Sequence, residues 1–238
     1  MSTAAGGRVC VDVHAHLAVR GRDTVDAVLD PGRHLADLDE MGIDIQVIGP
    51  MPTHDYAADE QGATRAVHAT NRCIAAHCAP APHRLLGLGT VAMQHPHLAV
   101  RQLEYAVQQL VLRGFSVGAS VQGRPLGDPA HDPVWRCAEA LGAVVFIHPG
   151  DGPHPTRWAS EALGDTVGQP AETAVALTDL IFTGVLDRFI TALPLRPNRQ
   201  VQQEFAGCAP DVRDIGDAPE PGLIFHAIRA GAAAGREI

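Results

Sequence analysis

The chain contains no lysine, because all 18 of its basic residues are arginine. This absence excludes a lysine Schiff base and a carbamylated lysine that bridges two metal ions. Basic charge is scarce overall, since 27 acidic residues leave a formal net charge of −9. Such a charge balance disfavours nucleic acid and anionic membranes as partners.

Cysteine and long apolar runs are also scarce. The five cysteines include no Cys-x-x-Cys pair, which argues against a disulfide scaffold and favours a reducing compartment, so we expect a cytoplasmic protein. Cys73 and Cys78 lie in a helical stretch and are expected to be small buried side chains. No apolar run reaches the length of a membrane span, and Met1 to Gly7 is too short and too polar for a signal peptide.

Strand-like and helix-like segments alternate along the chain, which is the pattern of βα units around a parallel sheet. With 238 residues and 46% apolar content, the chain fits a single α/β barrel domain. Asp30 as N-cap and Gly42 as stop delimit the first helix. The expected strands are 8–14, 43–49, 85–91, 115–119 and 143–147, and the expected helices are 31–41, 58–79, 97–112, 133–141 and 170–189.

The first strand ends in two histidines, His14 and His16. Because side chains alternate along a strand, both share a face with Asp12. If that face is the inside of a barrel, both imidazoles converge at its mouth, and neutral imidazole is a good ligand for zinc and similar divalent metals. Asp12 lies deeper on this face and is expected to support the site or the core rather than to bind metal.

The spacing of this pair is weak evidence alone, because 13 histidines in 238 residues give roughly 0.7 His-x-His pairs by chance. A second pair, His95 and His97, opens a helix and is interpreted as two solvent-facing side chains. The first pair gains weight from His148, which ends the fifth strand where α/β barrels keep their catalytic residues. We therefore predict a metal site of His14, His16 and His148. The alternative for His148 is a polar residue that caps its strand.

Six segments, in their order and spacing, resemble the amidohydrolase-related superfamily, and within it the family of aminocarboxymuconate-semialdehyde decarboxylase. The segments are 11–16, 84–91, 113–118, 146–149, 168–173 and 184–189. The resemblance covers about residues 8–189 and implies a distorted, TIM-like (β/α)8 metal-dependent hydrolase barrel. It also implies one divalent metal, usually zinc, with His14, His16 and His148 matching three of its ligands, and a metal-activated water that attacks an unsaturated substrate, which then loses carbon dioxide.

The expected function is that of a carboxy-lyase (decarboxylase) acting on a small unsaturated or aromatic carboxylic acid. A metal-dependent hydrolase of the same superfamily is the alternative among enzymes. A non-catalytic remnant, or a partner of a full-length homologue, is the alternative outside them. Neither nucleic acid nor a membrane is an expected partner, and a homodimer is compatible with the sequence.

Three loop residues are candidates for substrate binding. His54 follows the second strand and could contact a substrate carboxylate or carry a proton near neutral pH. Its alternative interpretation is an exposed loop histidine. Arg157 and Trp158 lie in the loop after the fifth strand and could bind an anionic, conjugated substrate by charge and stacking.

The sequence after Phe189 departs from the family pattern. The resemblance implies a base histidine followed by glycines after strand six and a metal-binding aspartate after strand eight, and no His-Gly-Gly occurs past Phe189. We expect residues 1–189 to form the N-terminal part of the barrel, about five βα units, and 190–238 to be an atypical tail that arose from a frameshift or a truncation. Such a barrel is incomplete and leaves two open sheet edges.

Overall fold

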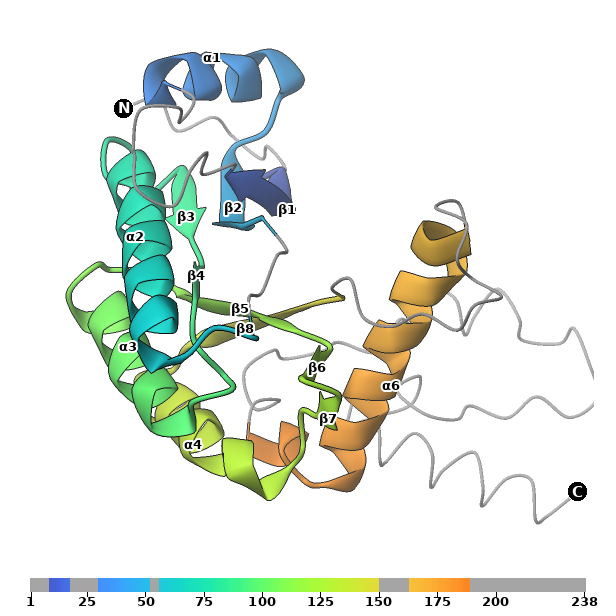
Figure 1. Ribbon diagram of the computed structural model, residues 1–238. Helices are drawn as coiled ribbons and strands as arrows, with labels where there is room; N and C mark the ends of the chain where they lie inside the picture. Colours follow the sequence, from blue (N-terminus) through green and yellow to red (C-terminus); the bar gives the residue numbers. More distant parts are fainter. Residues whose placement is uncertain (1–8, 18–29, 52–55, 150–162, 189–238) are drawn as a thin grey trace, which may run out of the picture. The chain divides into compact units, whose positions relative to one another are not determined.

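Parallel strands and the helices that connect them dominate a computed structural model of the chain (Figure 1). The structure describes residues 9–17, 30–51, 56–149 and 163–188. Contacts divide the chain into two compact units, Met1–Leu180 and Ile181–Ile238. The strands and the candidate site both belong to the first unit.

Strands and helices alternate along the first unit, as the sequence predicts. The strands are β1 (Val11–Leu17), β2 (Ile45–Pro50), β3 (Leu85–Gly87), β4 (Gly89–Thr90), β5 (Gly114–Gly118), β6 (Ser120–Val121), β7 (Arg124–Pro125) and β8 (Val144–His148). The α-helices are α1 (Pro31–Met41), α2 (Glu60–Cys78), α3 (Pro96–Gln108), α4 (Asp132–Leu141) and α6 (Gln169–Phe182). Short 3-10 turns, η1 (Pro129–His131) and η4 (Leu186–Arg188), and a π-helical turn, η3 (Gly164–Gly168), complete the described elements.

The strands pair in the order in which they occur in the chain. One sheet has the order β1-β2-β3 and a second has the order β4-β5-β8, and all of these pairs are parallel. Since β3 and β4 are consecutive parts of one segment, the two sheets follow one another as in a barrel. The predicted α/β architecture with parallel strands is confirmed, but β1 and β8 each pair on one side only among the described residues, so the barrel is not closed. The β6–β7 hairpin was not predicted.

The expected strand 85–91 is divided at Leu88, whose N–H donates to the Ile48 carbonyl at 2.8 Å. Beyond the break, an amide from α2 bonds to the backbone of β4. Asn71 Nδ2 donates to the Thr90 carbonyl at 2.9 Å, and the Thr90 N–H donates to Asn71 Oδ1 at 2.8 Å. Gly89 permits this approach, because a Cβ at that position would lie 2.9 Å from Asn71 Oδ1. The side chain of Asn71 thus joins α2 to the start of the second sheet.

Three other predicted elements have bounds that are wrong by three residues or more, namely the first strand, the helix 97–112, which ends at Gln108, and the helix 170–189. The first strand does not end at His14 but continues to Leu17, because His16 pairs with Gly49 and Leu17 with Pro50 of β2. The helix expected to reach Phe189 ends at Phe182. Gly184 follows with φ 74°, a left-handed conformation that ends helices and that glycine adopts readily.

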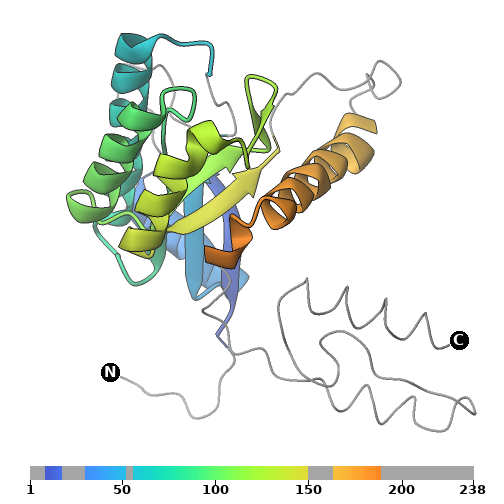
Figure 2. The same ribbon diagram turned by 90° about the horizontal axis from the view of Figure 1, so that it is seen from below.

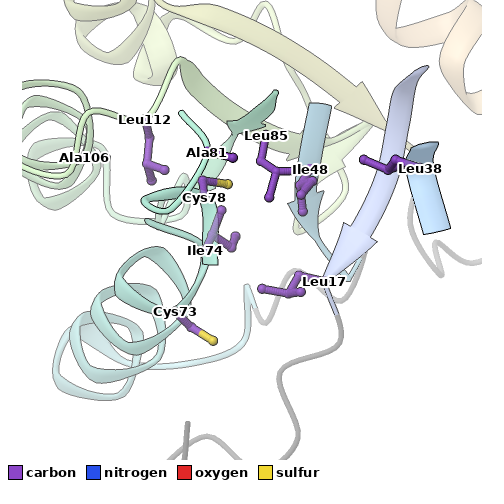
Figure 3. Packing of buried hydrophobic residues seen from close by; sticks show 10 residues of the cluster. All are labelled: Leu17, Leu38, Ile48, Cys73, Ile74, Cys78, Ala81, Leu85, Ala106 and Leu112. Atoms are coloured by element: carbon purple, nitrogen blue, oxygen red, sulfur yellow. The ribbon is translucent and has the colours of Figure 1, made fainter. Parts of the chain in front are cut away.

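Helices α2, α3 and α4 lie side by side, and α2 and α3 pack against β4 and β5 (Figures 1 and 2). Figure 3 shows the core cluster that joins β1 and β2 to α1 and α2 through side chains such as Leu17, Leu38, Ile48 and Ile74. The expected caps of α1 are confirmed, since Asp30 accepts a hydrogen bond from the Arg33 N–H and Gly42 has φ 70°. Cys73 and Cys78 are buried, as expected.

No helix within the described ranges has both the length and the apolar character that a bilayer crossing requires.

Candidate metal centre

The structure brings His14, His16 and His148 together, although β1 and β8 stand at opposite ends of the strand order. The ring centroids are 4.8 Å apart for His14–His16, 5.0 Å for His14–His148 and 4.9 Å for His16–His148. Five neighbouring strands in a flat sheet would hold the outer two about 19 Å apart, given roughly 4.8 Å per strand. The strands therefore curl, as barrel strands do, so that the ends of β1 and β8 meet.

The nitrogen atoms of this histidine cluster are spaced for a shared ion. The three potential ligand atoms all lie within 4.8 Å of one another. His14 Nε2 and His16 Nε2 are 2.9 Å apart. Two nitrogens bound to one tetrahedral ion at about 2.0–2.1 Å lie about 3.3 Å apart, so this pair needs to open by only about 0.4 Å.

Backbone carbonyls fix the tautomers of two of the rings. His16 Nδ1 lies 2.8 Å from the Pro50 carbonyl oxygen, and His148 Nδ1 lies 2.7 Å from the Pro149 carbonyl oxygen. A carbonyl oxygen only accepts, so Nδ1 carries a proton in both rings, and in the neutral form of each ring Nε2 is the nitrogen that has the lone pair. Histidines that bind metals are commonly oriented in this way.

Burial disfavours the charged form of the His148 ring. His148 is 6% exposed. Burial lowers the pKa of His148, the hydrogen bond to Pro149 opposes this shift, and the nearby charges of His16 and His14 lower the pKa further. A metal ligand has to be deprotonated, so a lowered pKa favours ligation by His148 at neutral pH. Phe146 places its ring centroid 5.0 Å from that of His14 and gives the cluster an apolar neighbour.

Asp12 is hydrogen-bonded to the backbone of the cluster at His14 but is not a member of the cluster. Its Oδ1 accepts the His14 N–H at 3.0 Å and its Oδ2 accepts from Gln46 Nε2 at 2.8 Å. The hydrogen bond from His14, and next the one from Gln46, hold the pKa of the Asp12 carboxyl below its usual value. Within the described ranges, the group of side chains that could hold an ion consists of the three histidines alone.

The structure does not test the three candidate residues for substrate binding. His54, Arg157, Trp158 and the tail 190–238 lie outside the described residues, and their roles stay predictions. In the second His-x-His pair, His97 is exposed as expected. The expectation is wrong for His95, which is half-buried and whose Nε2 lies 3.0 Å from the Ala58 carbonyl oxygen.

Gln46 is the supporting residue that sequence reasoning missed. The signal was present, because Gln46 is the polar residue between Ile45 and Val47 in an otherwise apolar strand, and a buried polar side chain is informative. The hydrogen bonds of His16 and His148 to the Pro50 and Pro149 carbonyls could not be recognised from residue type, since every residue has a carbonyl group.

Comparison with known proteins covers most of the chain but not all of it. Residues 11–192 match the sequence profile of the family described as Amidohydrolase. A 2-amino-3-carboxymuconate-6-semialdehyde decarboxylase from Dictyostelium discoideum is 34% identical over 191 residues, which are 77% of this chain and 53% of the relative. A gamma-resorcylate decarboxylase from Polaromonas sp. strain JS666 is 28% identical over 172 residues, 66% of this chain and 52% of the relative. The chain thus spans about half the length of these relatives.

Solved structures share the fold. The crystal structure of a 5-carboxyvanillate decarboxylase from Novosphingobium aromaticivorans, complexed with manganese and 4-hydroxy-3-methoxy-5-nitrobenzoic acid, matches with a TM-score of 0.64 and 24% identity over 77% of this chain and 63% of that chain. A 2,6-dihydroxybenzoate decarboxylase from Rhizobium matches with a TM-score of 0.59 and 20% identity over 77% of this chain and 64% of that chain. The family match covers well over half of the chain and confirms the resemblance seen in the sequence. The chain belongs to the amidohydrolase family.

Proposed function

We propose that the protein is a metal-dependent carboxy-lyase that removes carbon dioxide from a small unsaturated or aromatic carboxylic acid. The observation that carries this proposal is the convergence of His14, His16 and His148 at the ends of two strands, with ring centroids at most 5.0 Å apart. The similarity to two decarboxylases supports the reaction class.

The residues present fit a divalent ion. Three neutral nitrogen donors suit zinc, whereas manganese and magnesium prefer oxygen ligands. We therefore propose zinc, although a solved relative was complexed with manganese. When bound, the ion would act as a Lewis acid that lowers the pKa of water and offsets negative charge on the substrate.

The chain itself would supply orientation. The Pro50 and Pro149 carbonyls hold the rings of His16 and His148 with Nε2 available for the ion. Phe146 beside His14 offers an apolar surface to the ring or double bond of a conjugated acid. His54, which follows β2 in the sequence, and the Arg157–Trp158 pair, which follows β8, are proposed to contact the carboxylate and the conjugated system of the substrate.

A panel of substrates tests the reaction class. The purified full chain, loaded with zinc or with manganese, is incubated with hydroxybenzoic acids and with unsaturated dicarboxylic acids, and released carbon dioxide is measured by mass spectrometry. Amides and lactones are assayed in parallel for hydrolysis. We expect carbon dioxide release that chelation abolishes and that His148→Ala removes, while His97→Ala, a change at an exposed histidine outside the cluster, retains it.

The same experiment separates the alternatives. Hydrolysis without carbon dioxide would assign the protein to the hydrolases of the family. Bound metal without turnover of any substrate would indicate a non-catalytic chain.

A further inference from the structure

The strand that carries His14 and His16 is irregular just before His14. Asp12 lies opposite Gln46 and Ala15 lies opposite Ile48, so β1 takes three residue steps where β2 takes two. The extra residue is a β-bulge, a feature that changes the direction of side chains and occurs often beside functional sites. The direction of the His14 ring therefore depends on what holds this bulge.

The side chain of Asp12 holds the bulge. Its Oδ1 accepts the backbone N–H of His14, two residues further along, at 3.0 Å. This is the local hydrogen bond by which aspartate side chains stabilise turns in place of regular pairing. The backbone at His14 is thereby fixed by a carboxylate instead of by the neighbouring strand.

Gln46 in turn holds the carboxylate. Its Nε2 donates to Asp12 Oδ2 at 2.8 Å, so each oxygen of the carboxylate has a donor. The opposite amide orientation would place Oε1 against a carboxylate oxygen, where two acceptors repel one another. The charge of Asp12 therefore decides the orientation of the amide of Gln46.

This arrangement costs folding free energy at Gln46. The residue is 6% exposed, and its Oε1 has no hydrogen-bond partner among the residues that the structure describes. A buried acceptor without a hydrogen bond is unfavourable, and an apolar side chain in a parallel strand such as β2 avoids that cost. A glutamine at this position is therefore better explained by what it holds than by the stability of the sheet.

We infer that Asp12 and Gln46 are a positioning pair, which fixes the bulge in β1 so that the ring of His14 faces His16 and His148. The inference rests on the proposed metal site and assigns neither residue as a ligand, since both oxygens of Asp12 already accept hydrogen bonds. Loss of the pair should weaken metal binding by about 10- to 100-fold, the effect usual for residues that orient metal ligands.

Binding of Co²⁺ tests this inference, with affinity measured by competition against a chromophoric chelator and geometry by the visible absorption spectrum. Asp12→Ala removes the acceptor for the His14 N–H. It should weaken Co²⁺ binding by about 10- to 100-fold and alter the spectrum. Asp12→Asn keeps an oxygen for that N–H, and the amide of Gln46 can turn to accept from the new amide, so it should rescue most of the affinity. Asp44→Ala is the matched control, because Asp44 Oδ2 also accepts a backbone N–H, from Cys10 at 2.8 Å, away from the histidines.

Gln46→Leu separates positioning from stability. It removes the buried Oε1 together with the hydrogen bond to Asp12, two changes of opposite sign, so thermal unfolding of the metal-free variant should stay close to the wild-type temperature, while Co²⁺ affinity falls. It also keeps the test valid if Asp12→Ala fails to fold. Wild-type affinity in both Gln46→Leu and Asp12→Ala would overturn the positioning role and leave the proposed metal site intact. Absence of Co²⁺ binding by the wild-type protein would overturn both.

Discussion

The hydrogen bonds of the Asn71 amide to β4 can be tested by one substitution, because a single change removes both of them. Asn71 is 2% exposed and bonds to both the N–H and the carbonyl of Thr90. Asn71→Leu keeps the number and branching of the side-chain heavy atoms but offers neither donor nor acceptor. Each bond contributes about 1 kcal/mol net, and burial of the groups left behind raises the cost, so we expect a loss of about 2–4 kcal/mol.

Urea unfolding followed by circular dichroism measures this loss as a change in the free energy of unfolding. In a protein of this size, 1 kcal/mol corresponds to roughly 2–4 °C in Tm, so the melting temperature should fall by about 4–16 °C. Arg72→Ala, a change at the next and exposed position of α2, is the control and should stay within about 0.5 kcal/mol of wild type. If Asn71→Leu is as stable as Arg72→Ala, the two hydrogen bonds to Thr90 do not stabilise β4.

Three further predictions follow from single groups. Burial lowers the pKa of His148 below its ordinary 6.5, so the unfolded chain binds this proton more readily than the folded one. The free energy of unfolding of the metal-free protein should therefore fall as the pH drops below about 6.5, and His148→Gln should reduce that slope; equal slopes would contradict this. Tyr56→Phe removes the hydroxyl that accepts the Gly118 N–H at 3.0 Å, and Gly118 pairs with His148 across the sheet. This change should lower the free energy of unfolding by about 1–3 kcal/mol in chemical denaturation. An unchanged midpoint would show that the hydrogen bond is dispensable. Burial raises the pKa of Cys78 to about 11, so iodoacetamide at neutral pH should alkylate exposed Cys10 well before Cys78, and peptide mapping that finds similar rates would refute this assignment of burial.

The cluster of histidines could be anticipated from the sequence because it depends on two simple regularities. Side chains alternate along β1, which puts His14 and His16 on one face, and parallel strands present their carboxyl ends at one edge, which brings in His148. The first helix was predicted with its bounds because its signals are local, namely the Asp30 cap and the Gly42 stop.

Features that depend on tertiary contacts could not be predicted. The two hydrogen bonds between the Asn71 amide and the backbone of Thr90 join a helix to a strand 19 residues further along the chain, and no local pattern signals them. The bulge in β1 is visible only once the register against β2 is known, and with it the role of Gln46. Sequence patterns give the direction of each strand but not the hydrogen bonds that a side chain from elsewhere makes to it.

Metal content shows most directly whether the three histidines bind one ion. Structural zinc sites of four ligands contribute about 10–16 kcal/mol, so one ligand accounts for about 2.5–4 kcal/mol. At 1.4 kcal/mol per factor of ten, removal of one ligand raises Kd on the order of 10²- to 10³-fold. We predict near-stoichiometric zinc in wild type and in His97→Ala after dialysis, and loss of zinc in His14→Ala and His148→Ala. Equal zinc in all four proteins would contradict the claim that these imidazoles share one ion.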